Sequence, residues 1–224
     1  MKRTILARIA LFVVVVAPLV LAGCGTSPPS RFYVLNAVKA QETGGQVTTA
    51  PQSGFIAVGP VQIPDYLDRP QIVTRTAQNE LAINEFERWG GSLREDVDRV
   101  LVENLSALLA SDGVAVVSWK RRAPGAYRLP VEVNRFDAVR GGSVLLKATW
   151  GVSSPDGTKV LLVKGSTISQ PLNEKDYSAV VAAMSQTLGA LSQEIAAGIK
   201  SLIAAGTIKA PPGTAAESGK GKPN

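Results

Sequence analysis

Apolar residues recur at every second position over much of this chain, and at every third or fourth position in two long stretches. The period of two is clearest through Val144, Leu146, Ala148, Trp150 and Val152. Alternation of this kind is typical of strands that bury one face. From this pattern and from runs of β-branched residues, we expect strands over residues 31–35, 55–61, 71–75, 80–84, 114–119, 127–133, 144–152 and 160–166.

The two stretches with helical spacing predict long amphipathic helices. The first begins at Ser92, which forms with Glu95 the pattern of a capping box. The second runs from Tyr177 and ends at Gly206. The apolar stripes are Leu93, Val97, Val100, Leu101, Leu105, Leu108 and Leu109 in the first, and Tyr177, Val180, Val181, Met184, Leu188, Leu191, Ile195, Ile199 and Leu202 in the second. Together the elements predict a two-layer α+β domain, in which two helices pack on a mixed, mostly antiparallel sheet.

The N-terminus has the pattern of a secretory leader. Basic residues precede an apolar run over 9–21, which closes on Gly23 and Cys24. This box resembles that of bacterial lipoproteins, in which the chain is cut before the cysteine and the cysteine gains acyl chains. An ordinary signal peptide and a single membrane span are the alternatives, although the apolar run is shorter than the ~20 residues that a span requires. Gly25 follows the cysteine, which resembles the default for sorting to the outer membrane.

These features divide the chain into four parts. We expect a signal peptide over 1–23, a lipidated tether over 24–30, one α+β domain over 31–206, and a disordered tail over 207–224 that is rich in Pro, Gly, Ser and Lys. Removal of the leader leaves roughly 200 residues, which favours a single domain. A polar stretch without periodicity, residues 38–53, predicts a mobile loop within that domain.

The composition argues against an enzyme. The chain has no histidine and a single cysteine, so the commonest general base and metal ligand are missing, and acylation of Cys24 removes the thiol. No glycine-rich nucleotide-binding motif is present. Glu95, Asp96 and Asp98 cluster in sequence, but they fall on polar helix positions, where we expect them to be solvated. The net charge of +6 falls to about +3 without the three basic residues of the leader, which is too weak to indicate nucleic-acid binding. We therefore expect no cofactor, no metal and no catalytic residue.

Two motifs carry a resemblance to a known family. The stretch from Val58 to Val73, with VGPVQIPDYLDRPQIV, is the more specific, and Arg88, Trp89 and Leu93 match a second motif. Over about residues 30–205 the chain resembles the ABC-type transport auxiliary lipoproteins, which include the lipoprotein of the paraquat-inducible membrane-integrity system. The resemblance implies a noncatalytic outer-membrane subunit that helps a mammalian-cell-entry type protein and its transporter to move lipid across the periplasm. A homo-oligomeric ring is a further implication. Within the second motif, between Trp89 and Leu93, residues 90–92 depart from the family pattern.

The loop from Pro64 to Pro70 is the predicted contact surface. Its two prolines forbid a regular helix or central strand, and Tyr66, Leu67 and Arg69 are residue types that dominate binding interfaces. The candidate partner-binding residues are Tyr66, Leu67, Asp68, Arg69 and Trp89. A structural role for the loop is equally open, with Tyr66 and Leu67 covering the sheet while Asp68 pairs with Arg69 or caps a turn.

A second function fits the same residues. The chain could be a structural or assembly lipoprotein of the outer membrane that acts on a β-barrel or on lipopolysaccharide without a transporter. Neighbouring permease, ATPase and mammalian-cell-entry genes would favour the transport function, and an isolated gene would favour the alternative.

Overall fold

The computed structural model describes residues 28–38, 54–121, 123–172, 174 and 176–209. The predicted signal peptide, the acylated Cys24, most of the predicted loop over 38–53 and the C-terminal tail from residue 210 lie outside these residues. The predictions made for those parts of the chain therefore stay predictions.

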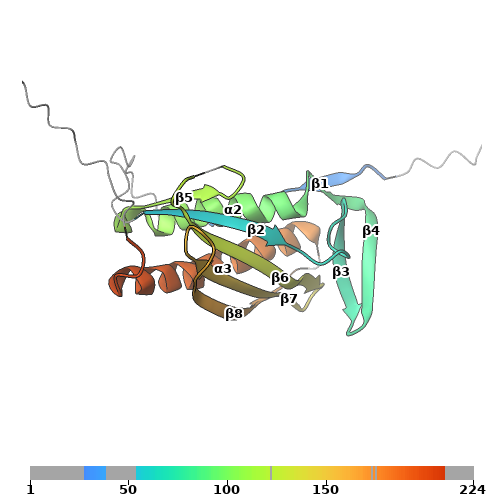
Figure 1. Cartoon of the computed structure of the whole chain (residues 1–224). Helices are drawn as coiled ribbons and strands as arrows, with labels where there is room; N and C mark the ends of the chain where they lie inside the picture. The colour runs from blue at the N-terminus through green and yellow to red at the C-terminus, as the bar shows by residue number, and fades with distance from the viewer. Residues whose placement is uncertain (1–27, 39–53, 122, 173, 175, 210–224) are drawn as a thin grey trace, which may run out of the picture. The chain divides into compact units, whose positions relative to one another are not determined.

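Eight strands and two long helices make up the described part of the chain (Figure 1). The strands are β1 (Arg31–Tyr33), β2 (Gly54–Gln62), β3 (Gln71–Ala77), β4 (Glu80–Trp89), β5 (Val114–Ser118), β6 (Tyr127–Val139), β7 (Ser143–Ser153) and β8 (Val160–Pro171). The helices are α2 (Leu93–Leu108) and α3 (Tyr177–Ala204), with a short 3₁₀ turn, η1 (Ala110–Asp112), after α2. The α+β class and the two-helix plan predicted from the sequence are confirmed.

The strands form one mixed sheet, in which β6 is the central strand. One edge of β6 pairs with β7, which pairs in turn with β8, and both ladders are antiparallel. The other edge of β6 pairs in parallel with β2 along its first half, and with β3 at its end. The parallel strand β5 lies beyond β2, while β4 and then β1 extend from β3. Parallel pairs need crossover connections, and α2 lies in the connection that returns the chain to β5 beside β2.

The apolar residues that alternate in the sequence form the buried face of the sheet. Leu129, Val131 and Val133 of β6 are each at most 2% exposed, and so are Val144 to Val152 at every second position of β7. Both helices cover this face, with α2 packed on β2 and β5 and α3 packed on β7 and β8. Trp150 fills the space under α3 and donates a hydrogen bond from Nε1 to Ser166 Oγ at 2.9 Å. The opposite face of the sheet has neither α2 nor α3 on it.

The start of α2 corrects two expectations. Ser92 is the N-cap, but within the described residues its side chain makes no capping hydrogen bond, and the Glu95 carboxylate accepts instead from Lys120 Nζ at 2.9 Å. Asp96 and Asp98 are not simply solvated, because each is bound to another element. Asp98 Oδ2 accepts from Ser118 Oγ at 2.7 Å, and Asp96 binds the chain that follows β1.

Residues Val34 to Val38 form a strap that is bound to the side chains of both helices. On the α2 side, the Leu35 N–H donates to Asp96 Oδ2 at 3.2 Å, and the Leu35 carbonyl accepts from Arg99 Nη2 at 2.6 Å. The Val38 N–H donates to Asn104 Oδ1 at 3.1 Å. Leu35 itself is completely buried. Side chains of α2 thus satisfy a backbone segment that forms no strand pairing there.

The α3 side completes the attachment of the strap. The Asn36 N–H donates to Ser185 Oγ at 3.1 Å, and Asn104 Nδ2 donates across to Ser192 Oγ at 3.2 Å. Gly189 makes room for the strap, because a Cβ built there would lie 2.4 Å from Val38 Cγ2. The small and polar residues on this side of α3 therefore serve a packed contact within the chain.

Asn104→Ala should lower the free energy of unfolding by about 1–2 kcal/mol, because it leaves the Val38 N–H without its acceptor in a part-buried site. Urea unfolding followed by circular dichroism measures this change. Glu103→Ala, on the exposed position next to it, is the matched control and should change the same quantity by no more than about 0.5 kcal/mol. Equal effects of the two substitutions would contradict the role given to Asn104.

Candidate functional site

The loop from Pro64 to Pro70 is a compact turn that packs its middle against the core. The Leu67 N–H donates to the Pro64 carbonyl at 2.9 Å, and the Asp68 N–H donates to the Asp65 carbonyl at 3.2 Å. The Pro70 carbonyl accepts from the backbone of β4 at 2.7 Å. The backbone of the loop is therefore fixed at both its turn and its end.

A buried carboxylate joins this loop to the sheet. Asp137 of β6 is completely buried, and its Oδ2 accepts from Tyr66 Oη at 3.0 Å and from Arg75 Nη2 at 2.9 Å. Its Oδ1 lies 2.9 Å from Arg135 Nη2. Burial by itself raises the pKa of Asp137, but the hydrogen bonds from the two arginines outweigh it and hold the pKa below its usual range. Burial, and then the charge of Asp137, raise the pKa of Tyr66.

The five candidate contact residues divide into buried and exposed groups. Leu67 is 2% exposed and Trp89 is 4% exposed, so their side chains offer no surface to a partner. Both serve the core, which corrects their assignment as candidate contacts. Tyr66 is half-buried over Asp137. Asp68 and Arg69 are exposed, and they are the part of the loop that a partner can reach.

Asp68 pairs with a residue that the sequence did not indicate. Its carboxylate forms an ion pair with Arg94 in the first turn of α2. The loop is therefore tied to α2 as well as to β6, and the expected pairing of Asp68 with Arg69 is replaced by this contact. The structural interpretation of the loop is correct for Tyr66 and Leu67, while Asp68 and Arg69 stay available on its outer side.

A further exposed residue beside this loop, a tryptophan, was not predicted from the sequence as a contact residue. Trp119 follows β5 and is 49% exposed, and its indole lies over Gly59 so closely that a Cβ built there would be 2.2 Å from Trp119 Cδ1. Gly59 has φ +109°, a conformation that side chains disfavour. The signal in the sequence was the run Trp119-Lys120-Arg121 at the end of a strand, where an aromatic residue stands among cations.

Two hollows meet at Trp119. One has a volume of about 330 Å³ and reaches α2, with Pro60, Asp68, Arg94, Glu95 and Lys120 in its wall. The other has a volume of about 550 Å³ and is lined on the far side by Gly59, Arg121, Pro124 and Arg128. We call the exposed side chains of Pro60, Asp68, Arg94, Trp119 and Lys120, together with Arg69 next to Asp68 in the loop, the Trp119 surface.

Asp98 adds an unused acceptor to the wall of the smaller hollow. Its Oδ1 is buried and has no hydrogen-bond partner among the residues that the structure describes. A buried polar atom without a partner is costly. The Trp119 surface itself offers an aromatic anchor and charged neighbours of both signs. These groups suit binding of another molecule.

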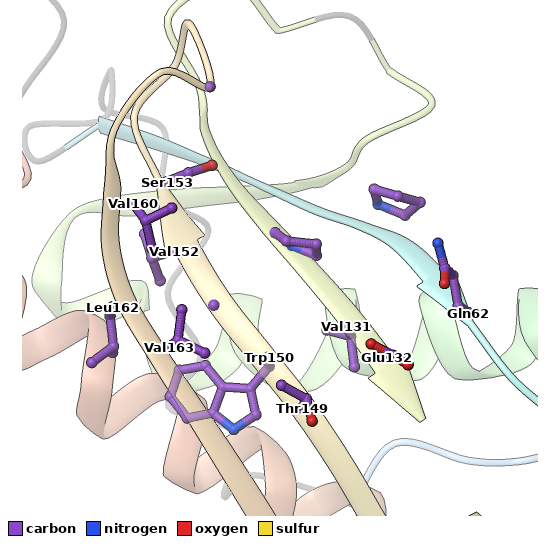
Figure 2. Close-up of a pocket in the computed structure, with 14 residues that line it drawn as sticks. Gln62, Val131, Glu132, Thr149, Trp150, Val152, Ser153, Val160, Leu162 and Val163 are labelled. Carbon is purple, nitrogen blue, oxygen red and sulfur yellow. The ribbon is translucent and has the colours of Figure 1, made fainter. Parts of the chain in front are cut away.

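A separate groove lies on the uncovered face of the sheet. It has a volume of about 330 Å³, and Figure 2 shows the residues of β2, β6, β7 and β8 that surround it. Val160, Val163 and Pro130 make it largely apolar, with Glu132 at one side. Gly151 lines the groove and has no side chain to fill it. A Cβ built there would lie only 2.8 Å from the Leu162 carbonyl oxygen.

Neither described helix is both long and apolar enough to cross a bilayer. Within the same residues, no three Asp or Glu side chains come together in a way that could hold a metal ion.

This chain matches a family model and a named transport lipoprotein. Residues 33–196 match the family model described as the ABC-type transport auxiliary lipoprotein component. The chain is 28% identical over 140 residues to the intermembrane transport lipoprotein PqiC of Escherichia coli, which covers 62% of this chain and 72% of PqiC.

Solved structures show the same fold. A crystal structure described only as an uncharacterized protein has a TM-score of 0.64 at 20% identity, covering 77% of this chain and 99% of that one. A protein of Xanthomonas campestris has a TM-score of 0.62 at 19% identity, covering 80% of this chain and all of that one.

Proposed function

The chain belongs to the ABC-type transport auxiliary lipoprotein family, and from this premise we propose that it is a noncatalytic docking subunit of a lipid transport system. The observation that carries the proposal is the family match across residues 33–196, which includes both helices up to Ala196 and the whole sheet apart from the first two residues of β1. The similarity to PqiC supports transport between membranes as the process. In this role the chain supplies a surface and an attachment point, and its partners supply the energy.

The attachment point is the acylated Cys24. Two or three acyl chains hold a protein stably at a bilayer, whereas one is marginal. Gly25 after the cysteine supports the periplasmic face of the outer membrane as the place of attachment. The partner is then a mammalian-cell-entry type protein that reaches across the periplasm from a transporter in the inner membrane.

The Trp119 surface is the proposed contact with that partner. Interfaces draw most of their binding energy from a few Trp, Tyr and Arg residues that sit in hollows. Trp119 and Arg94 line the smaller hollow, and Arg69 is exposed on the loop next to Asp68. The ion pair of Asp68 with Arg94 fixes the edge of the hollow. The rigid loop lowers the cost of ordering on binding.

Arg69→Glu combined with Trp119→Ala should weaken binding of the mammalian-cell-entry type partner about tenfold or more. Surface plasmon resonance with the purified partner measures the affinity. Lys147→Glu makes the same change of charge on an exposed position of β7 and is the matched control. An unchanged affinity in the double variant, with an unfolding midpoint like that of the wild type, would remove the Trp119 surface from the proposal.

Cross-linking in cells tests the function as a whole. A photo-reactive amino acid at position 69 should capture the mammalian-cell-entry type protein, identified by mass spectrometry. Capture of a β-barrel protein instead would support the alternative, a structural or assembly lipoprotein that works without a transporter.

A further inference from the structure

Exposed apolar side chains gather on the outward face of β1 and β4, which lie side by side (Figure 1). On β4, Glu87 and Trp89 are 5% and 4% exposed, so Phe86 and Arg88 turn to the other face. The parallel register sets Phe32 opposite Arg88, which makes Phe32 a neighbour of Phe86 on that face. Phe32 is 66% exposed and Phe86 is 36% exposed.

Val34 continues this group beyond the end of β1. The Gly90 N–H donates to the Tyr33 carbonyl at 2.7 Å, and a Cβ built at Gly90 would lie 3.1 Å from Val34 Cγ1. Val34 is 49% exposed. We call Phe32, Val34 and Phe86 the Phe32 patch.

The inward face of the same two strands holds the patch rigidly. Glu87 accepts from Arg31 and from Tyr33 Oη, the latter at 2.7 Å. Burial, together with the hydrogen bond to Glu87, raises the pKa of Tyr33 to about 12. This hydrogen-bonded layer fixes both strands, so the phenylalanines cannot turn inward without breaking it. Arg88, on the same face as Phe86, places a cationic side chain beside the patch.

The position of the patch along the chain indicates what covers it. Eight residues lead from Cys24 to Phe32, and a fully extended chain of that length reaches at most about 29 Å. An acylated Cys24 therefore keeps Phe32 within that distance of the lipid. Apolar patches with a polar rim mark sites of contact with proteins or membranes, and the positive charge of Arg88 beside this patch suits the anionic head groups of a bilayer.

We propose that the Phe32 patch rests in the surface of the bilayer that holds Cys24, with Phe32, Val34 and Phe86 among the lipid head groups and Arg88 beside their phosphates. The inference rests on the proposed acylation of Cys24. The patch is then a second membrane contact besides the acyl chains. The two contacts together set how the domain is oriented on the membrane, with the end of the sheet formed by β1 and β4 against the lipid.

Electron paramagnetic resonance on the full acylated protein in vesicles of phosphatidylethanolamine and phosphatidylglycerol tests this. A nitroxide on Val34→Cys is unique, because Cys24 is the only natural cysteine and acylation blocks its thiol. Accessibility to oxygen and to a water-soluble nickel complex should place this label about 5–10 Å into the interface. A nitroxide on Val163→Cys, a site that is 62% exposed on β8, is the matched control and should be in water.

Adding Phe32→Ser and Phe86→Ser to the Val34→Cys chain should move the label into water without changing the unfolding midpoint. A label in water on the vesicle-bound parent chain, or one that the two serines do not move, would overturn the inference while leaving the anchor intact. Spin–spin broadening that disappears on dilution with unlabelled protein would assign the patch to a second copy and overturn it too. Labelling of the wild-type chain would show a free Cys24, and both the inference and the proposed anchor would then fail.

Discussion

Asp137→Asn will lower the free energy of unfolding by about 3 kcal/mol or more, because the two arginines lose the carboxylate that neutralises them. The side chains of Arg75 and Arg135 are only 15% and 30% exposed, and Asp137 is fully buried. The substitution keeps the shape of the side chain and removes only its charge, so the change reports the cluster and not a cavity. Urea unfolding at neutral pH measures it.

Tyr66→Phe is the matched control for this cluster. It removes the hydrogen bond to Asp137 Oδ2 and leaves both ion pairs in place. A single hydrogen bond to a charged group corresponds to about 1.5–3 kcal/mol at most, so this variant should lose less stability than Asp137→Asn. The opposite ranking would mean that the phenol, and not the ion pairs, attaches the loop to the sheet.

The same carboxylate gives the protein a pH dependence with a definite sign. The pKa of Asp137 is lower in the folded chain than the value of about 3.9 expected when unfolded. Its contribution is therefore complete above about pH 4, and it is lost as the pH falls through the folded pKa. Asp137→Asn should flatten this part of the stability curve measured between pH 5 and pH 2. Parallel curves for the two proteins would contradict the role of the cluster.

Cys24→Ala will abolish attachment to the outer membrane. Without the thiol the proposed acylation cannot occur, and the acyl chains that would hold the protein at the bilayer are lost. Fractionation of cells should show the protein missing from the outer membrane and present either as soluble protein or as precursor that keeps its leader. A substituted chain that still floats with outer-membrane vesicles would show another means of attachment.

Gly25→Asp separates attachment from sorting. This variant keeps Cys24 and should stay bound to membrane, but the residue after the cysteine then resembles the signal for retention in the inner membrane. After the two membranes are separated on a sucrose gradient, the variant should be found in the inner-membrane fraction. An outer-membrane position for both chains would contradict the sorting role given to Gly25.

Sequence periodicity anticipated the layers of this fold because each layer buries one face. The alternating apolar residues of β7, such as Val144 and Trp150, form the sheet side of the core. The apolar stripes on α2 and α3 form its helix side. Strand ends were less predictable. The strand expected over 80–84 extends to Trp89, because pairing with β1 comes from a distant part of the chain. A local pattern cannot contain such a contact.

The candidate site was predicted only in part, for the same reason. The loop from Pro64 to Pro70 was found, but the burial of Leu67 and Trp89 depends on tertiary packing. Asp137 looked like one more polar residue on a strand, and its partners Arg75 and Tyr66 lie more than 60 positions away. Trp119 was counted within a strand, although the structure ends β5 at Ser118 and leaves the indole on the surface.

The strap gives the domain a particular mechanical behaviour. Any tension on the N-terminus reaches Val34 to Val38 directly after β1, where hydrogen bonds to Asp96, Arg99, Asn104 and Ser185 lie one after another along the chain. A pull along that direction strains several of these bonds together in shear, instead of opening them one at a time. Tension on the N-terminus would therefore be transmitted to the whole helix pair, and the proposed Trp119 surface beside α2 would move with it.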